Sequence, residues 1–221
     1  MTQEAEPNPP ATESTEGPDA TRAEAPVRKR PKPGERRVQI LHTLAGMLEQ
    51  PGAERVTTAA LAAKLDVSEA ALYRHFASKA QMFEGLIEFI EQSVFSLVAQ
   101  ITQREGAPGQ QAARLVAMLL QFGEKNPGMT RVMAGDALVF ENERLQQRMN
   151  QFFDKFEAAL RQCLRGDAQA GASATPTVDG QVQASLLTAF VMGRLQRYAR
   201  SGFKRSPTEH LDAVLQRLIA N

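Results

Sequence analysis

The chain has 221 residues with 26 basic and 25 acidic side chains, a formal net charge of +1 and a length typical of one or two domains. No apolar run reaches about 18 residues, and the first residues lack an apolar signal segment, so we expect a cytoplasmic protein without a membrane partner. Cys163 is the single cysteine and no Cys/His cluster is present, which argues against a disulfide, a metal ion or another cofactor. Strand formers never alternate over a long run, and Ala, Leu, Gln, Glu and Arg dominate, so the composition predicts an all-α fold.

Charge is distributed unevenly along the chain. Residues 1–27 contain six acidic residues and one basic residue, and they are rich in Pro, Glu, Thr and Ala. This composition predicts a disordered tail. Residues 28–32 follow as a basic arm, which either contacts phosphates or the DNA minor groove or is a solvated linker. We therefore expect residues 1–34 to form a tail and arm outside the folded domains.

The next residues predict a DNA-reading unit. Residues 35–50 carry apolar side chains at helical spacing and predict a first helix. Residues 57–79 predict two short helices joined by a turn at Asp66, because Asp tolerates a left-handed backbone. Ser68 is expected to cap the second of these helices. Together the three helices make a helix-turn-helix domain over residues 35–78, the arrangement that enters the DNA major groove.

The exposed face of this unit carries the residues expected to bind DNA. Small and polar groups at the start of the second short helix suit base edges, whereas Tyr73, His75 and Lys79 suit phosphates. Residues 28–79 have a net charge of +5, as a DNA-binding module requires. A simple two-helix corner is the alternative, but it needs no polar, aromatic and basic cluster. The expected DNA-binding residues are Thr57, Thr58, Ser68, Glu69, Ala70, Tyr73, Arg74, His75 and Lys79.

Residues 79–221 predict a larger helical bundle. Helices are expected over about 79–103, 110–125, 129–135, 139–165, 181–201 and 208–220, with a flexible surface loop at 166–180. The last two helices carry apolar residues on more than one face, which favours burial against a second copy in a two-fold dimer. The expected dimerisation residues are Leu186, Leu187, Phe190, Leu195, Leu211, Leu215 and Leu218.

Several stretches carry a resemblance to a known family. Residues 57–83 resemble the reader of the TetR-like repressors, through Leu72-Tyr-Arg-His-Phe76, Ser78-Lys79 and Met82-Phe83. The stretches Leu86-Ile-Glu-Phe-Ile-Glu91, Phe122-Gly-Glu-Lys-Asn-Pro-Gly-Met-Thr-Arg131 and Arg200-Ser-Gly-Phe-Lys204 are similar to the nucleoid occlusion factors within that family. The resemblance covers most of residues 35–210. It implies a nine-helix two-fold dimer that binds short palindromic sites in double-stranded DNA on the nucleoid.

The same resemblance implies a protein partner. Such factors capture the C-terminal tail of the division protein FtsZ while they are bound to DNA, and thereby antagonise the division ring over the chromosome. The tail lies in a groove between the fourth and fifth helices. Leu97 and Gln121 stand where an Arg and a Gly are expected in relatives. Carried over to this chain, the groove residues are Phe89, Val94, Met118, Phe122, Lys125 and Asn126.

No catalytic residue is expected. In sequence, neither a nucleophile nor a paired carboxylate accompanies His75, and His42 and His210 are isolated, so the chain is not predicted to be an enzyme. The alternative function is that of a repressor that releases DNA when a small molecule fills the C-terminal bundle. A ligand pocket calls for convergent polar and aromatic groups. The chain has no Trp and only two Tyr, which disfavours this alternative.

Overall fold

The computed structural model describes residues 34–50, 56–104, 106–139, 141–170 and 176–219. The regular elements in these ranges are all helical, which confirms the predicted all-α class. The expected acidic tail and basic arm lie outside the described residues. The elements are α1 (Glu35–Leu48), α2 (Thr58–Lys64), α3 (Glu69–Tyr73), α4 (Lys79–Thr102), α5 (Pro108–Lys125), α6 (Pro127–Met133), the 3-10 helix η1 (Asp136–Leu138), α7 (Glu143–Ala170), α8 (Pro176–Arg200) and α9 (Leu211–Ile219).

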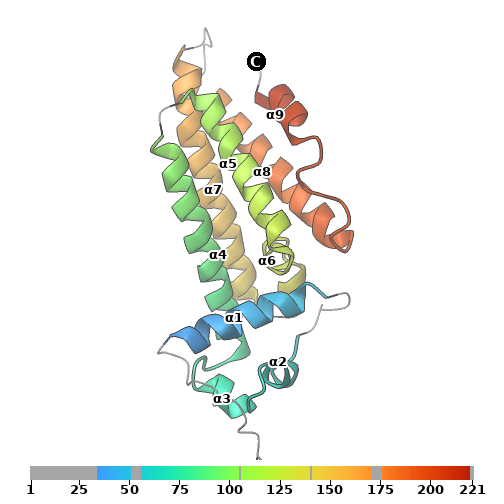
Figure 1. Ribbon diagram of the computed structural model, residues 1–221. Helices are drawn as coiled ribbons and strands as arrows, with labels where there is room; N and C mark the ends of the chain where they lie inside the picture. The colour runs from blue at the N-terminus through green and yellow to red at the C-terminus, as the bar shows by residue number, and fades with distance from the viewer. Residues whose placement is uncertain (1–33, 51–55, 105, 140, 171–175, 220–221) are drawn as a thin grey trace, which may run out of the picture. The chain divides into compact units, whose positions relative to one another are not determined.

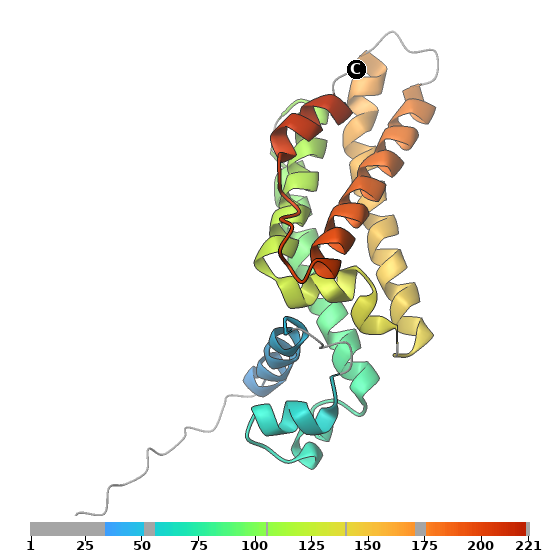
Figure 2. The same cartoon turned by 90° about the vertical axis from the view of Figure 1, so that its right-hand side faces the viewer.

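The long helices α4, α5, α7 and α8 pack into a bundle, and α2 and α3 lie beyond one end of it (Figure 1). Helix α1 lies between that pair and the bundle and contacts α2, α4 and α6. Helix α9 packs on α5 toward the opposite end (Figure 2). One cluster of buried apolar side chains extends from Leu61 and Phe76 in the helix-turn-helix domain (residues 35–78, the reader) to Phe152 and Phe156 in the bundle. The reader is therefore joined to the bundle by a shared core.

The main departure from the sequence expectation concerns the surface loop at 166–180. Helix α7 continues to Ala170 and α8 already begins at Pro176, so most of these residues are helical. The Gly and Ala content suggested a loop, but Ala and Gln are good helix formers and proline is favoured at the first helical position. Elsewhere the predicted helices begin or end within a few residues of the observed bounds, and η1 precedes α7.

The turn of the helix-turn-helix has the predicted left-handed residue. Asp66 has a φ of 55°. Its backbone N–H bonds the Ala63 carbonyl, and the N–H of Val67 bonds the Ala62 carbonyl, both at 3.1 Å. This pair of bonds is the Schellman arrangement, in which a left-handed residue ends a helix and its last carbonyls are satisfied. Val67 then packs against the core.

Side-chain caps begin the next helices. The Thr57 hydroxyl accepts a bond from the Ala60 amide at 3.2 Å, and the Ser68 hydroxyl accepts one from the Ala71 amide at 3.3 Å. Ser78 caps α4 by accepting from the Gln81 amide at 3.1 Å. The Ser68 bond confirms the predicted cap, and all three bonds satisfy amides that have no partner within the first turn.

Helix α6 joins the reader to the bundle at close range. A Cβ atom on Gly128 would stand 2.7 Å from the Ala45 carbonyl carbon in α1, and closer still to its oxygen. On the other side, the Thr130 hydroxyl donates to the Gly123 carbonyl in α5 at 2.8 Å. The position of α1 is therefore set by backbone contact with α6, which is itself bonded to α5.

None of the helices within the described ranges is long and apolar enough to cross a membrane. In the same part of the chain, no group of three or more His, Cys, Asp or Glu side chains is arranged to hold a metal ion.

Candidate functional site

Most of the residues expected to bind DNA have exposed side chains. Tyr73 is 44% exposed. Thr57, Ser68, Glu69, Ala70, Arg74 and His75 are also exposed. The Thr57 and Ser68 hydroxyls accept their bonds from backbone amides, so each retains its hydrogen for an acceptor such as a phosphate oxygen.

Two of the expected residues fix the two short helices to one another. The Thr58 hydroxyl in α2 donates to the Glu69 carboxylate in α3 at 2.6 Å. A bond across the turn holds the start of α3 against α2. Thr58 and Glu69 therefore position α3 against α2, and direct DNA contact by these two side chains stays a prediction.

Arg37 is a reader residue that sequence reasoning missed. Its guanidinium donates to the His75 carbonyl at 2.8 Å and lies over the Phe76 ring, 4.0 Å from the ring centre. Arg37 thus ties α1 to the exit of the reading helix, which carries Arg74 and His75. Its position in the basic run after Gly34 gave no signal of this role, because the contact spans 38 residues.

Lys79 is not freely exposed. Its ammonium pairs with the Glu141 carboxylate, and the two side chains are 28% and 11% exposed. The ammonium also lies 5.7 Å from the centre of the Phe83 ring. A phosphate contact by Lys79 therefore competes with an ion pair inside the protein.

The surface expected to hold a partner lies on α4 and α5, which pack side by side (Figure 1). Phe89, Met118 and Phe122 are partly buried, and each packs against the core with its remaining surface open. Lys125 is exposed at the end of α5. The exposed fraction of Leu97 is 36%.

Two residues of the expected groove have structural roles. Val94 is fully buried and offers no surface to a peptide in this structure, because its position on α4 faces the core. Asn126 donates from its side-chain amide to the Phe122 carbonyl at 2.7 Å, which satisfies a carbonyl at the end of α5. The carbonyl bond fixes the side chain of Asn126 at the junction of α5 and α6.

The expected dimerisation residues divide into two groups. Leu187 and Leu195 are fully buried, and Leu211 and Leu215 are 7% and 6% exposed, so their side chains belong to the core of one protomer. Phe190 and Leu218 are partly buried against that core. Helix α9 directs its apolar face onto α5, which the sequence pattern did not reveal. Leu187, Leu195, Leu211 and Leu215 are therefore corrected from interface to core, whereas a dimer contact by Phe190 or Leu218 stays a prediction.

A different apolar face remains exposed on α8. Val178, Val182 and Leu186 recur every four residues and are 57%, 63% and 51% exposed, and Met192 farther along is 43% exposed. Residues spaced by four lie along one side of a helix. Of the expected set, only Leu186 belongs to this stripe, which was missed because the buried and exposed faces of α8 are both apolar.

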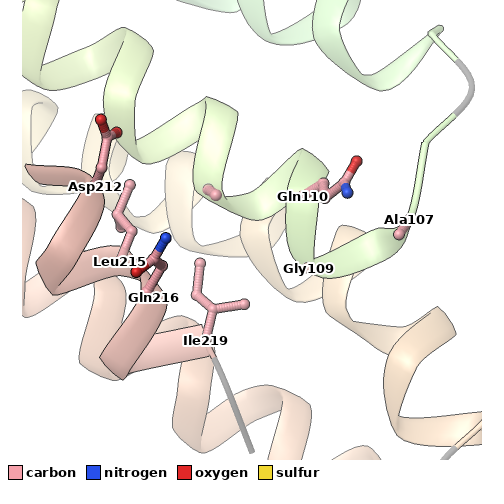
Figure 3. Close-up of a pocket in the computed structure, with 8 residues that line it drawn as sticks. Ala107, Gly109, Gln110, Asp212, Leu215, Gln216 and Ile219 are labelled. Carbon is pink, nitrogen blue, oxygen red and sulfur yellow. The ribbon is translucent and has the colours of Figure 1, made fainter.

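A cavity of about 560 Å³ opens between the start of α5 and α9 (Figure 3). Ala113, Leu215 and Ile219 give it an apolar floor, and Gln110, Asp212 and Gln216 bring polar groups to it. None of the described residues that line it is aromatic.

The sequence matches two family descriptions. Residues 40–86 match "Bacterial regulatory proteins, tetR family", and residues 111–221 match "Tetracyclin repressor-like, C-terminal domain". The nucleoid occlusion factor SlmA of Photobacterium profundum is 50% identical over 186 residues, which are 84% of this chain and 94% of that protein. The chain belongs to the SlmA family of nucleoid occlusion factors. SlmA of Vibrio cholerae is 49% identical over 80% of this chain and 90% of its own length. This membership confirms the resemblance and places the chain among DNA-binding regulators rather than enzymes.

Solved structures share the TetR-like fold with this SlmA family member. The fatty acid degradation regulator FadR of Bacillus halodurans superposes with a TM-score of 0.69 at 16% identity, over 86% of this chain and 98% of that one. FadR of Bacillus subtilis, solved with stearoyl-CoA, has a TM-score of 0.67 at 13% identity, over 83% and 97% of the two chains. At these identities the likeness concerns the fold alone.

Proposed function

We propose that the protein binds palindromic DNA sites as a homodimer and, while bound, captures the C-terminal tail of FtsZ, which antagonises division-ring assembly over the nucleoid. The observation that carries this proposal is the 50% identity to a nucleoid occlusion factor over most of both chains. The protein would then act in the cytoplasm, on the nucleoid. We divide it into the tail and arm at 1–34, the reader at 35–78 and the dimerisation and partner-binding domain at 79–221.

The geometry of the reader supports DNA binding. Small and polar side chains, including Ser68 and Ala70, stand at the start of α3, where the first turn of a reading helix meets base edges. Tyr73, Arg74 and His75 follow at its exposed end, where hydroxyl and basic groups reach phosphates. We therefore assign base contact to the first group and phosphate contact to the second.

The surface of α4 and α5 supports capture of an acidic and apolar tail. Phe89, Met118 and Phe122 offer apolar surface, and the exposed ammonium of Lys125 offers a charge of opposite sign to a carboxylate. Leu97 adds an apolar side chain where an Arg is expected in relatives, so apolar contact carries more of the binding here. Asn126 stabilises the end of α5 beside this surface, because its side-chain amide donates to the Phe122 carbonyl.

The exposed stripe on α8 supports the dimer. Val178, Val182, Leu186 and Met192 present large apolar side chains that a second copy would bury through a self-complementary two-fold contact. Two linked readers then engage two half-sites, which is how palindromic DNA is recognised.

Substitution of Lys125 by Glu should separate tail binding from DNA binding. The change reverses a charge on the tail-binding surface, so we expect affinity for a synthetic FtsZ tail peptide to fall roughly tenfold or more. DNA affinity should stay unchanged, because the helix-turn-helix is untouched. Fluorescence polarisation measures both, on the labelled peptide and on a palindromic duplex that the protein selects from a random pool.

The matched control is Arg217→Glu, the same charge reversal on α9. That helix lies toward the end of the bundle remote from α6 (Figure 1). The control should keep both affinities. Loss of both affinities in Lys125→Glu would indicate misfolding or a shared site, and loss of neither would remove this surface from the proposal.

One observation favours the alternative of a ligand-responsive repressor. The cavity between α5 and α9 can admit a small molecule (Figure 3). It lacks the aromatic lining typical of such pockets. A repressor of this kind would ignore the tail peptide, so formation of a ternary complex of protein, DNA and peptide distinguishes the two functions.

A further inference from the structure

The ion pair between Lys79 and Glu141 joins the start of α4 to the segment between η1 and α7. Lys79 is the first residue of α4 and directly follows the capping residue Ser78. Glu141 is anchored from the other side, because its amide donates to the Leu138 carbonyl of η1 at 3.0 Å. The pair therefore links the exit of the reader to the bundle.

The positions of the acid and the base in this ion pair are reversed relative to the other ion pairs along α4 and α7. In the described residues, Arg144 on α7 pairs with Glu84 on α4, and Arg148 and Lys155 on α7 pair with Glu91 on α4. Among the ion pairs of the described residues that join these two sides, only the one at the reader end has its base on α4 and its acid on the α7 side. The reversal places a positive charge on the residue that begins α4, shortly after the reading helix in the chain, and pairs it with a carboxylate that is nearly buried.

The surroundings of the pair make it a strong competitor for DNA. The Glu141 side chain is 11% exposed, so salt screens its charge less than that of a surface carboxylate. An ammonium in contact with this carboxylate must give up that contact, or stretch it, to bind a phosphate oxygen. Removal of Glu141 should free the ammonium, whereas removal of Lys79 should leave a shielded carboxylate without its partner.

We propose that Glu141 is a positioning residue that holds Lys79 back from the DNA phosphates, so that DNA binding requires exchange of a protein carboxylate for a phosphate. The inference rests on the proposed phosphate contact of Lys79. It assigns the η1–α7 segment a direct part in setting DNA affinity, although that segment carries no DNA-reading residue. The exchange also releases Glu141 from its ion pair with Lys79 whenever the protein is bound to DNA.

The experiment compares four variants in DNA binding over a range of salt concentrations: Glu141→Gln, Lys79→Ala, the double variant and Glu143→Gln. Glu143→Gln is the matched control, because it removes an exposed acidic charge two residues away that forms none of the ion pairs described above. We expect Glu141→Gln to bind DNA about fivefold more tightly. This is the change in affinity that corresponds to the loss of a competing ion pair as strong as the strongest surface pairs. The slope of log affinity against log salt for this variant should stay close to that of the wild type, because Lys79 neutralises a phosphate in both complexes, whereas Lys79→Ala should flatten the slope by about 0.9.

The double variant tests whether Glu141 acts through Lys79. When Lys79 is already Ala, the added change Glu141→Gln should alter DNA affinity no more than Glu143→Gln does, because no ammonium remains to be freed. Equal gains from Glu141→Gln and Glu143→Gln, or a gain that persists without Lys79, would overturn the proposal. If Lys79→Ala alone leaves affinity and slope unchanged, the phosphate contact itself fails and the inference fails with it. Should Glu141→Gln unfold, Glu141→Asp retains the charge on a shorter side chain, and it should give a smaller gain in the same direction.

Discussion

Replacement of Gly128 by Ala tests how the reader is held on the bundle. The added Cβ would stand 2.7 Å from the carbonyl carbon of Ala45 and 3.3 Å from its Cα, and still closer to the carbonyl oxygen. Real Cβ atoms essentially never come within 3.0 Å of another heavy atom, and here the obstructing atoms are backbone rather than a flexible side chain. Helix α1 must therefore move away from α6, which disturbs the buried contacts of Leu41, Leu44 and Ala45.

The expected cost follows from overpacking. Inserting a methyl group into a well-packed region costs about 1–3 kcal/mol, and a backbone obstruction favours the upper end. For a chain of this size each 1 kcal/mol lowers the melting temperature by about 2–4 °C, so Gly128→Ala should melt roughly 6–12 °C lower. Gly46→Ala, in the interior of α1, is the matched control, because nothing lies within 4 Å of its added Cβ. Its better helix propensity should raise stability by about 0.5–1 kcal/mol.

Thermal and urea unfolding of the two variants measure the difference. DNA binding should report the same displacement, since a shift of α1 moves the reader relative to the bundle and, in the proposed dimer, alters the spacing of the two reading helices. Affinity of Gly128→Ala should therefore fall more on a full palindrome than on a single half-site. If Gly128→Ala were as stable as Gly46→Ala, the close contact between α6 and α1 would not determine the position of the reader.

Three further predictions concern the dimer, the turn and the DNA surface. Leu186→Asp should yield a folded monomer by light scattering, whereas Leu187→Asp should unfold the protein, because the first side chain is 51% exposed and the second fully buried. Asp66→Val should lower the free energy of unfolding in urea by about 1–2 kcal/mol, because a β-branched residue disfavours a φ of 55°; unchanged stability would contradict the strain argument. Tyr73→Ala should weaken specific and scrambled duplexes alike, about fivefold by fluorescence anisotropy, as for loss of one hydrogen bond to phosphate. A changed sequence preference would instead indicate base contact.

Local signals in the sequence determined the reader. The cap at Ser68 and the left-handed turn at Asp66 depend on residues no more than five apart, so propensity and hydrogen-bonding chemistry were sufficient to predict them. Short stretches such as Phe122–Arg131 also carried the resemblance to the family, which the 50% identity to a nucleoid occlusion factor confirms. The charge of residues 28–79 likewise needed only composition.

Only the tertiary structure decided which apolar face meets which neighbour. Leu187, Leu211 and Leu215 read as interface from the sequence, because a helix with two apolar faces does not reveal which one its own protomer covers. The partners of Lys79 and Arg37 are 62 and 38 residues away, beyond the reach of any periodicity. The sequence by itself therefore determined the elements, their caps and the family, while chain packing decided burial, ion pairing and the surfaces left for DNA and protein partners.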